Sequence, residues 1–468
     1  MGEETSLKPI PPAPPEAKGL GILKWIGPAV IISAMDVGGG EMIMASTVGA
    51  KYGPWLAWTI LVGAFMIYWA TQESARYSAL TGETPLYGFY RVHPILAWIA
   101  FLSEIIWTLF FSVGIIANSG EAAYWLSGEI LPWQFWAILL YLLIVIVLIA
   151  PKWIYWVLEK ITTISAIIQI GGMIICAIVV TTLTGLVEFI MGMFSFGYLP
   201  PGADLALVLG LVGSGFGSGA GTALAAGYYV RERGIGIAGY IGKVRGLLGK
   251  EEEIPVKGFK PSTDHESISN WKNWLKIIRT NILGVLWPIN LFGGLIFMYV
   301  ATLVLRPKGL VPSGMKTVSV VAENFKVILG PAGWTLFMIV GLFNLWDTML
   351  GCIDRDCRIE GNAIRFLVPG LEKKISERKA YMLILVLSFL CGSMFLFVEK
   401  PFFLFLLQAI FSAVVAPTIV FCFFMTRKLL PKEYRAHPIV YAFIIISIIY
   451  YCIMAVLGVA SAFGIKLL

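Results

Sequence analysis

The chain has 468 residues, of which 58% are hydrophobic and only 13% are charged. Soluble domains carry about 25% charged residues, so the composition excludes that class and predicts an all-α, multi-pass protein embedded in a lipid bilayer. The formal charge of +7 reflects membrane topology, as described below, and does not indicate nucleic acid binding.

The residues at the start of the chain, 1–20, are polar and rich in proline, and we expect a disordered cytoplasmic tail. Runs of about 20 apolar residues follow, which is the length of a helix that crosses a bilayer. About eleven such spans can be placed, at residues 21–49, 54–80, 95–120, 133–150, 157–183, 204–230, 277–304, 332–353, 379–398, 402–426 and 438–463.

The basic residues predict the orientation of these spans. If the N-terminus is cytoplasmic, 28 of the 35 Lys and Arg residues fall in cytoplasmic segments. Because cytoplasmic loops carry an excess of Lys and Arg, we expect the N-terminus inside and the C-terminus outside. The expected location is the inner membrane of a prokaryotic cell.

Two spans have dense glycine clusters at their centres. Span 1 contains Gly38, Gly39 and Gly40, and span 6 contains six glycines from Gly210 to Gly221. Interrupted helices at corresponding places in two five-span halves indicate an inverted-repeat transporter with a site near the bilayer midplane. The predicted parts are a first repeat at 21–183, a second repeat at 184–426 with a cytoplasmic loop at 231–274, and a loop with the eleventh helix at 427–468.

Span 1 also carries two carboxylates, Asp36 and Glu41. An interior glycine costs a helix about 1 kcal/mol relative to alanine, and a carboxylate at bilayer depth costs about 2.5 kcal/mol or more. We therefore interpret Gly38, Gly39, Gly40 and Glu41 as a helix break that binds substrate. The alternative is that Glu41 only caps the second half of the helix, an effect of about 0.3–1 kcal/mol.

Span 6 is predicted to unwind around its glycines. Backbone N–H groups at Gly215, Gly217, Ser218 and Gly219 would then approach a small anionic group, because no bulky side chain shields them. The alternative is that the small residues only allow helices to pack closely.

Span 8 provides Asp347 and Thr348, which together with Asp36 are candidates for binding or coupling an ion. Their hard oxygen atoms suit sodium, magnesium or calcium better than soft metals. The alternative for Asp347 is an ion pair with an arginine of the cytoplasmic cluster at 354–358.

The segments that carry a family resemblance, through their order and spacing, are residues 27–53, 72–83, 158–160, 347–361 and 417–429. They resemble the NRAMP divalent-metal transporters, which have the LeuT-type inverted-repeat fold. The resemblance covers most of the chain and implies that fold and a transport function.

This chain departs from the family at the residues that carry the chemistry. The resemblance lays Gly38 to Glu41 over the family's metal-binding Asp-Pro-Gly-Asn motif, and Gly217 or Gly219 over its methionine in helix six. Phe111 and Gly114 stand where the family has acids that carry protons. The soft-metal site and the usual proton route are therefore not expected.

We predict a secondary-active transporter that moves a small polar solute by alternating access, with sodium or a proton as the coupled cation. The alternative is a transporter of a hard divalent ion such as magnesium, with Glu41 as a metal ligand beside Asp36 and Asp347. A remote alternative is an intramembrane enzyme. The spans contain no His-Glu-x-x-His or paired-aspartate motif, so we expect no catalytic residues and no resident cofactor.

Overall fold

The computed structural model describes residues 6–14, 19–36, 38–149, 152–214, 220–241 and 255–462, and these are mainly helical. The first helices are α1 (Gly27–Asp36), α2 (Ser46–Tyr52), α3 (Ala57–Thr81), α4 (Pro85–Val92), α5 (Pro94–Ile106), α6 (Val113–Leu126), α7 (Trp133–Ile149), α8 (Lys152–Val180), α9 (Leu183–Met193), α10 (Leu205–Ser214) and α11 (Ala220–Arg233). The later helices are α12 (His265–Asn281), α13 (Trp287–Val304), α14 (Val318–Val321), α15 (Lys326–Leu367), α16 (Glu377–Phe395), α17 (Pro401–Val415), α18 (Val420–Leu429) and α19 (Pro438–Ala462).

Shorter elements connect or extend these helices. Three π-helical segments are η3 (Gly40–Ala45), η5 (Trp107–Phe111) and η7 (Ile282–Leu286). The 3₁₀ segments are η2 (Gly19–Trp25), η4 (Gly53–Leu56), η6 (Gly236–Tyr240), η8 (Arg306–Lys308), η9 (Ala322–Phe325), η10 (Leu371–Lys373), η11 (Ala416–Ile419) and η12 (Lys432–Tyr434). Two short strands, β1 (Leu7–Lys8) and β2 (Lys260–Pro261), pair in parallel.

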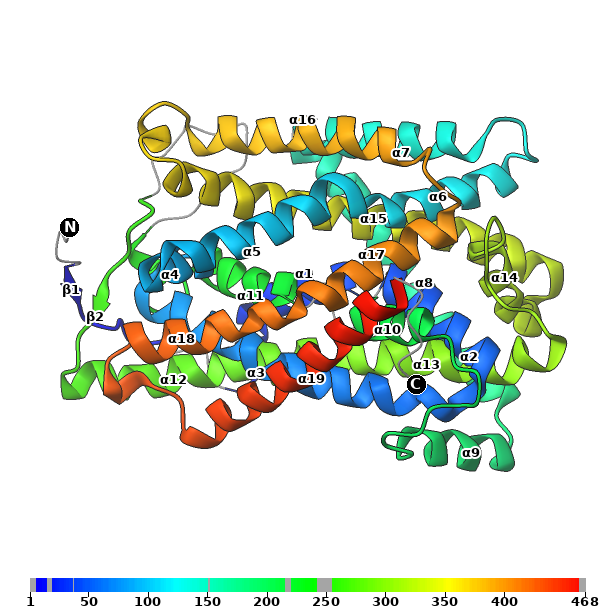
Figure 1. The fold of residues 1–468 in the computed structure, drawn as a ribbon, viewed down its shortest axis with the longest axis horizontal. Helices are drawn as coiled ribbons and strands as arrows, with labels where there is room; N and C mark the ends of the chain where they lie inside the picture. Colours follow the sequence, from blue (N-terminus) through cyan, green and yellow to red (C-terminus); the bar gives the residue numbers. More distant parts are fainter. Residues whose placement is uncertain are drawn as a thin grey trace.

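The helices form an elongated bundle (Figure 1). In this view α7 and α16 run along the upper edge, α3, α12 and α19 run along the lower side, and α1 and α11 lie between them. The described parts of the predicted spans 1 and 6 meet in the bundle, because α1 packs against α11 and α15, and α10 packs against η3 and α17. Residues distant in the sequence are thereby brought to one central region.

Each of the eleven predicted spans corresponds to helical structure. In the described residues, seven helical stretches are long and apolar enough to cross a membrane, or eight if a pair bent by 119° counts as one span. The count is lower than eleven because the predicted spans 1 and 6 are divided into short helices and α7 is short. In addition, η3, α2, η4 and α3 follow one another without a gap and count as one stretch.

The prediction of a disordered tail is wrong for residues 6–14. Leu7 and Lys8 pair with Lys260 and Pro261, and the Ile10 side chain is buried. The Ile10 N–H donates to Ser267 Oγ at 3.1 Å, and Trp274 Nε1 donates to the Pro11 C=O at 2.8 Å. The segment is ordered because α12 provides both an apolar surface and hydrogen-bond partners.

Asp264 begins α12 as its N-cap and accepts the Ser267 N–H at 2.8 Å. Hydrogen bonds from the Ser262 hydroxyl and from the Ser267 N–H and hydroxyl stabilise its charged form and hold the pKa of Asp264 at about 2. The start of α12 is therefore fixed before the helix reaches the bundle.

Gly213 provides a test of the close packing between α10 and α17. A Cβ at this position would lie 1.9 Å from the Ala409 carbonyl oxygen, and neither backbone can yield without moving a helix. We expect Gly213→Ala to cost about 1–3 kcal/mol, read as a lower unfolding temperature in detergent. Gly171→Ala in α8 is the matched control, because a Cβ there meets nothing within 4 Å. An equal effect of both substitutions would contradict this account of the packing.

Candidate substrate and ion site

The first span is broken where the sequence predicts. Helix α1 ends at Asp36, residue 37 lies outside the described residues, and η3 begins at Gly40. The Gly38 N–H donates to the Asp36 C=O at 2.8 Å, which is a bond of a tight turn and not of an α-helix. The predicted interruption of span 1 is confirmed.

Two glycines at the break lie against neighbouring helices. A Cβ at Gly38 would lie 1.8 Å from Thr348 Oγ1 of α15, and a Cβ at Gly39 would lie 2.6 Å from the Phe405 ring of α17. Any larger residue would push these helices apart. Close approach of backbone to neighbouring side chains is therefore one physical reason for glycine here, beside the helix break itself.

Glu41 lies in η3 and is completely buried. Neither of its carboxylate oxygens has a hydrogen-bond partner of normal geometry among the described residues. The N–H groups of Gly38 and of Glu41 itself face the carboxylate, and Gly294 of α13 leaves space beside Glu41 Cγ, because a Cβ there would lie 3.9 Å from it. A buried carboxylate without a partner is costly and needs a cationic or donor group beside it.

Asp36 is the second carboxylate of the break and is 7% exposed. Its Oδ2 accepts a hydrogen bond from Asn290 Nδ2 of α13 at 2.9 Å. It also interacts electrostatically with Glu41 and with Arg355. Asp36 and Glu41 therefore place two acidic groups near each other at the break, in contact with α13.

The candidate residues of span 6 lie between α10 and α11. Helix α10 ends at Ser214 and α11 begins at Ala220. The predicted substrate-binding residues Gly215, Gly217, Ser218 and Gly219 lie outside the described residues. Their role remains a prediction.

The structure places the two candidates of span 8 on different faces of α15. Thr348 is buried against Gly38, and its Oγ1 has no hydrogen-bond partner among the described residues. Asp347 is half-buried, and as the preceding residue of a helix it points about 100° away. Within the described part of the chain, no three His, Cys, Asp or Glu side chains gather so that they could hold a metal ion.

Phe111 and Gly114, which the resemblance lays over the family's proton-carrying acids, pack closely against neighbouring helices. Phe111 stacks on Phe411, with ring centroids 4.5 Å apart. A Cβ at Gly114 would lie 2.7 Å from backbone atoms of Leu404 and Phe405. A carboxylate has no space at Gly114 in this arrangement.

The fold of this chain is similar to that of solved structures. No family model matches the chain. An uncharacterized protein of Pasteurella multocida (strain Pm70) is 31% identical over 84 residues, which span 18% of this chain and only 19% of that protein. The manganese transporter of Eremococcus coleocola, in complex with an aromatic bis-isothiourea substituted compound, superposes with a TM-score of 0.66 at 12% identity, covering 100% of this chain and 92% of that one. A histidine-to-alanine mutant of the same transporter superposes with a TM-score of 0.69 at 10% identity, and the match covers 99% of this chain and 92% of that one.

The chain has the LeuT-type fold. At 10–12% identity the likeness concerns the fold alone. The predicted LeuT-type architecture is thereby confirmed, and the NRAMP resemblance holds at the level of the fold.

A second group of charged side chains in this LeuT-type fold was missed by the sequence analysis. Glu104 of α5 and Arg355, Asp356 and Glu360 of α15 are all buried. Arg355 Nε donates to Asp356 Oδ1 at 2.5 Å, and Thr108 Oγ1 donates to Glu360 Oε1 at 2.5 Å. The sequence signal was the i, i+4 spacing of Asp356 and Glu360, which places both on one face of a helix.

Asn290 was also missed, although it contacts the predicted ion ligand Asp36. Its sequence signal was an amide inside an apolar span, which is uncommon in a membrane helix unless it faces the bundle interior. The partner of such an amide lies 254 residues away in the sequence and only the fold brings the two together.

The contact between Gly38 and Thr348 predicts a clash and its rescue. Gly38→Ala is expected to lower the free energy of unfolding by about 1–3 kcal/mol, and Thr348→Ala in the same chain should restore part of it. Thermal unfolding in detergent measures both. Gly27→Ala at the start of α1 is the control, because a Cβ there meets nothing within 4 Å. Failure of Thr348→Ala to relieve the effect would show that another contact is responsible.

Arg355 is expected to be essential for stability. Removing it leaves Asp356 without its cationic partner in a buried site, which costs about 3–5 kcal/mol. We expect Arg355→Met to unfold at a much lower temperature than Arg358→Met. Arg358 pairs with Asp354 at 3.0 Å, but both side chains are 24% exposed, so water can replace part of the lost interaction and the loss should be smaller. Similar losses in the two variants would contradict this assignment.

Proposed function

We propose that this chain is a secondary-active transporter that moves a small polar solute across the membrane by alternating access. The substrate site is the break between Asp36 and Glu41, together with the predicted interruption of span 6. The observation that carries the proposal is the Glu41 carboxylate, which is 0% exposed and has two oxygens without hydrogen-bond partners of normal geometry among the described residues. The LeuT-type fold supports a transport function, because such folds place substrate at interrupted helices.

The state of Glu41 favours a solute with a cationic group. An ammonium group supplies both a positive charge and several N–H donors, so it would satisfy the two carboxylate oxygens at once. The N–H groups of an unwound span 6 would bind the carboxylate of the same solute. An amino-acid-like zwitterion therefore fits both halves of the proposed site.

A hard divalent cation fits the described residues less well. Such an ion takes about six or more oxygen ligands, typically including carboxylates. Asp36 and Glu41 provide two carboxylates, but no group of three potential metal-binding side chains occurs among the described residues. Uptake of a divalent ion, without uptake of an organic solute, would therefore contradict the solute proposal.

The coupled cation is proposed to be sodium. Thr348 Oγ1 and the backbone at Gly38 meet at the break, and hydroxyl and carbonyl oxygens are suitable ligands for a hard cation. Proton coupling through the family's route finds no support, because Phe111 and Gly114 occupy the positions of its acids.

Uptake by the protein in liposomes tests the proposal. Labelled amino acids and divalent ions are compared with and without a sodium gradient. We expect saturable, gradient-dependent uptake of an organic solute, reduced at least about ten-fold by Glu41→Gln, because removing the charge of a buried site leaves its cationic partner unpaired.

The matched control is Glu188→Gln. Glu188 is an exposed carboxylate that lies 3.5 Å from Arg306 at the surface, and its loss should leave uptake unchanged. Saturable divalent uptake that Glu41→Gln abolishes, without uptake of any organic solute, would overturn the proposal in favour of a metal substrate.

A further inference from the structure

A groove on the outside of the bundle follows α12 into η7. It has a free volume of about 430 Å³. Its lining residues are Lys272, Leu275, Lys276, Arg279, Thr280, Leu283 and Gly284. The groove therefore runs along one helical stretch, with its basic residues in α12 and an apolar end in η7.

The three basic side chains of the groove share one face of α12. Lys272, Lys276 and Arg279 follow the spacing i, i+4 and i+7, which places them above one another on a helix. All three are exposed. In the described part of the chain none of them forms an ion pair or a side-chain hydrogen bond. Three adjacent positive charges without an acidic partner favour an anionic ligand.

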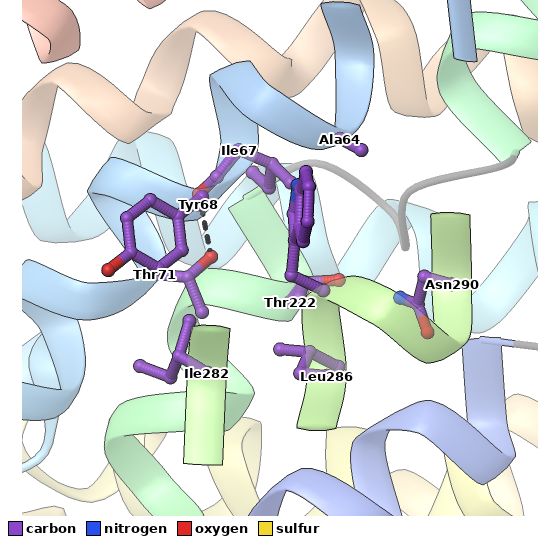
Figure 2. A pocket seen from close by; sticks show the side chains of 9 residues that line it. Ala64, Ile67, Tyr68, Thr71, Thr222, Ile282, Leu286 and Asn290 are labelled. Atoms are coloured by element: carbon purple, nitrogen blue, oxygen red, sulfur yellow. Dashed lines mark hydrogen bonds between the residues drawn. The ribbon is translucent and has the colours of Figure 1, made fainter. Parts of the chain in front are cut away.

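The apolar end of the groove faces away from the interior of the bundle. Figure 2 shows Ile282 and Leu286 of η7 at a small internal pocket. Leu283 and Gly284 lie between these two residues in the sequence and are exposed, Leu283 by 48%. An exposed leucine in a membrane-spanning stretch contacts lipid. The internal pocket is lined by Ala64, Ile67, Tyr68, Thr71, Thr222, Ile282, Leu286, Trp287 and Asn290.

The basic residues lie at the depth of the lipid headgroups. One helical stretch runs from His265 to Lys308. At a rise of about 1.5 Å per residue, Arg279 and Arg306 are about 40 Å apart along it, which matches a bilayer with its headgroup regions. Arg279 and Arg306 therefore mark the two surfaces of the bilayer, and Lys276 and Lys272 lie farther out beyond Arg279.

The end of the bundle that holds this groove is the one predicted to face the cytoplasm. In Figure 1 α12 lies at the same end as the N-terminus, β1 and β2. The distribution of Lys and Arg predicts a cytoplasmic N-terminus. The cytoplasmic leaflet carries the negative surface potential of anionic lipids, so the charge of the groove complements the lipid surface beside it.

We infer that this groove binds one anionic phospholipid of the surrounding bilayer. Lys272, Lys276 and Arg279 hold its phosphate-bearing headgroup. Leu283 and Gly284 contact the beginning of an acyl chain. A lipid fits better than a soluble phosphate, because the groove passes from basic residues directly into residues that face lipid. This inference goes beyond the proposed transport function and does not depend on it.

A lipid bound here would act on the beginning of span 1. Asn281 of α12 accepts the Ala29 N–H at 3.3 Å and donates to the Trp25 C=O at 2.9 Å. The same helix therefore carries the groove and holds the start of α1. A ligand that binds this arrangement stabilises it relative to any other position of α12.

Binding is tested on the whole protein in neutral detergent, without any transported solute. Mixed micelles with phosphatidylglycerol or with uncharged phosphatidylcholine are added, and the unfolding temperature is measured. We expect a saturable rise with phosphatidylglycerol that exceeds the rise with phosphatidylcholine, because a ligand of the folded state stabilises it. Added salt should reduce the difference, because it screens exposed charges.

A combined variant locates the site. Lys272→Gln, Lys276→Gln and Arg279→Gln together should weaken the apparent affinity for phosphatidylglycerol at least about ten-fold, because each basic residue at an anionic lipid surface contributes to binding. These side chains are exposed and unbonded within the described residues. The variant should therefore fold, and its unfolding temperature without lipid should match that of the wild type.

The matched control combines Lys373→Gln, Lys374→Gln and Arg378→Gln. It removes two exposed lysines and one exposed arginine from the region of η10 and the start of α16, outside the groove. The net charge changes by the same amount, but the response to phosphatidylglycerol should be retained.

Three results would overturn the inference. The first is a folded wild-type protein that responds equally to both lipids. The second is an equal loss of affinity in the two combined variants, since the attraction would then belong to the whole basic surface. The third is a rise with glycerol 3-phosphate that equals the rise with phosphatidylglycerol, since the ligand would then be a soluble phosphate.

The chain also contains an acidic run at residues 251–253, which lies outside the described residues. If the groove variant unfolds at a lower temperature without lipid, and Glu251→Gln, Glu252→Gln and Glu253→Gln together cause the same loss, this run is the occupant and the inference fails. None of these measurements involves a transported solute, so failure here leaves the proposed function standing.

Discussion

The Glu41 carboxylate, buried in an apolar bundle without a hydrogen-bond partner of normal geometry among the described residues, is the constraint on which the arrangement of the site depends. Such a group is tolerated only if a ligand, a proton or exposed backbone donors compensate for lost hydration. The break after Asp36 exposes backbone N–H groups at this depth, and Gly38 and Gly39 allow α15 and α17 to close over it. The same glycines therefore serve the helix break and the packing around it.

Three π-helical segments are associated with the polar groups of the bundle. Glu41 lies in η3, η5 contains Trp107 and Thr108, and η7 directly precedes the helix that carries Asn290. Trp107 Nε1 donates to Ser412 Oγ at 3.1 Å and its ring lies below the Arg355 guanidinium. A π-turn inserts an extra residue and turns the following side chains relative to the α-helical register, which is why such segments are frequent at functional sites.

Helices α1, α11 and α13 form one connected unit. Helix α1 contacts α11, and its last residue, Asp36, is bonded to Asn290 of α13. Asn290 also lines the pocket that contains Thr222 of α11. A change at the proposed solute site would therefore alter the contacts that α13 makes with α1 and α11.

The helical architecture and the break in span 1 were predictable because apolar run length and glycine content are local properties. The acid cluster of Glu104, Asp356 and Glu360 was not predicted, since it assembles from two helices whose approach is a tertiary property. The order of residues 6–14 was missed for the same reason, because their partners lie on β2 and α12. The predicted roles of Gly215 to Gly219 remain predictions.

By itself the sequence determined that the chain is a bundle of membrane-spanning helices and that its first span is interrupted beside two acids. Hydropathy and glycine content act within a single helix and therefore suffice for these conclusions. Only the tertiary structure decided that Thr348 meets Gly38, that Asn290 binds Asp36, and that Thr222 faces the same small pocket. These contacts depend on which face each helix turns toward its neighbours, and distances of up to 310 residues along the chain separate their members.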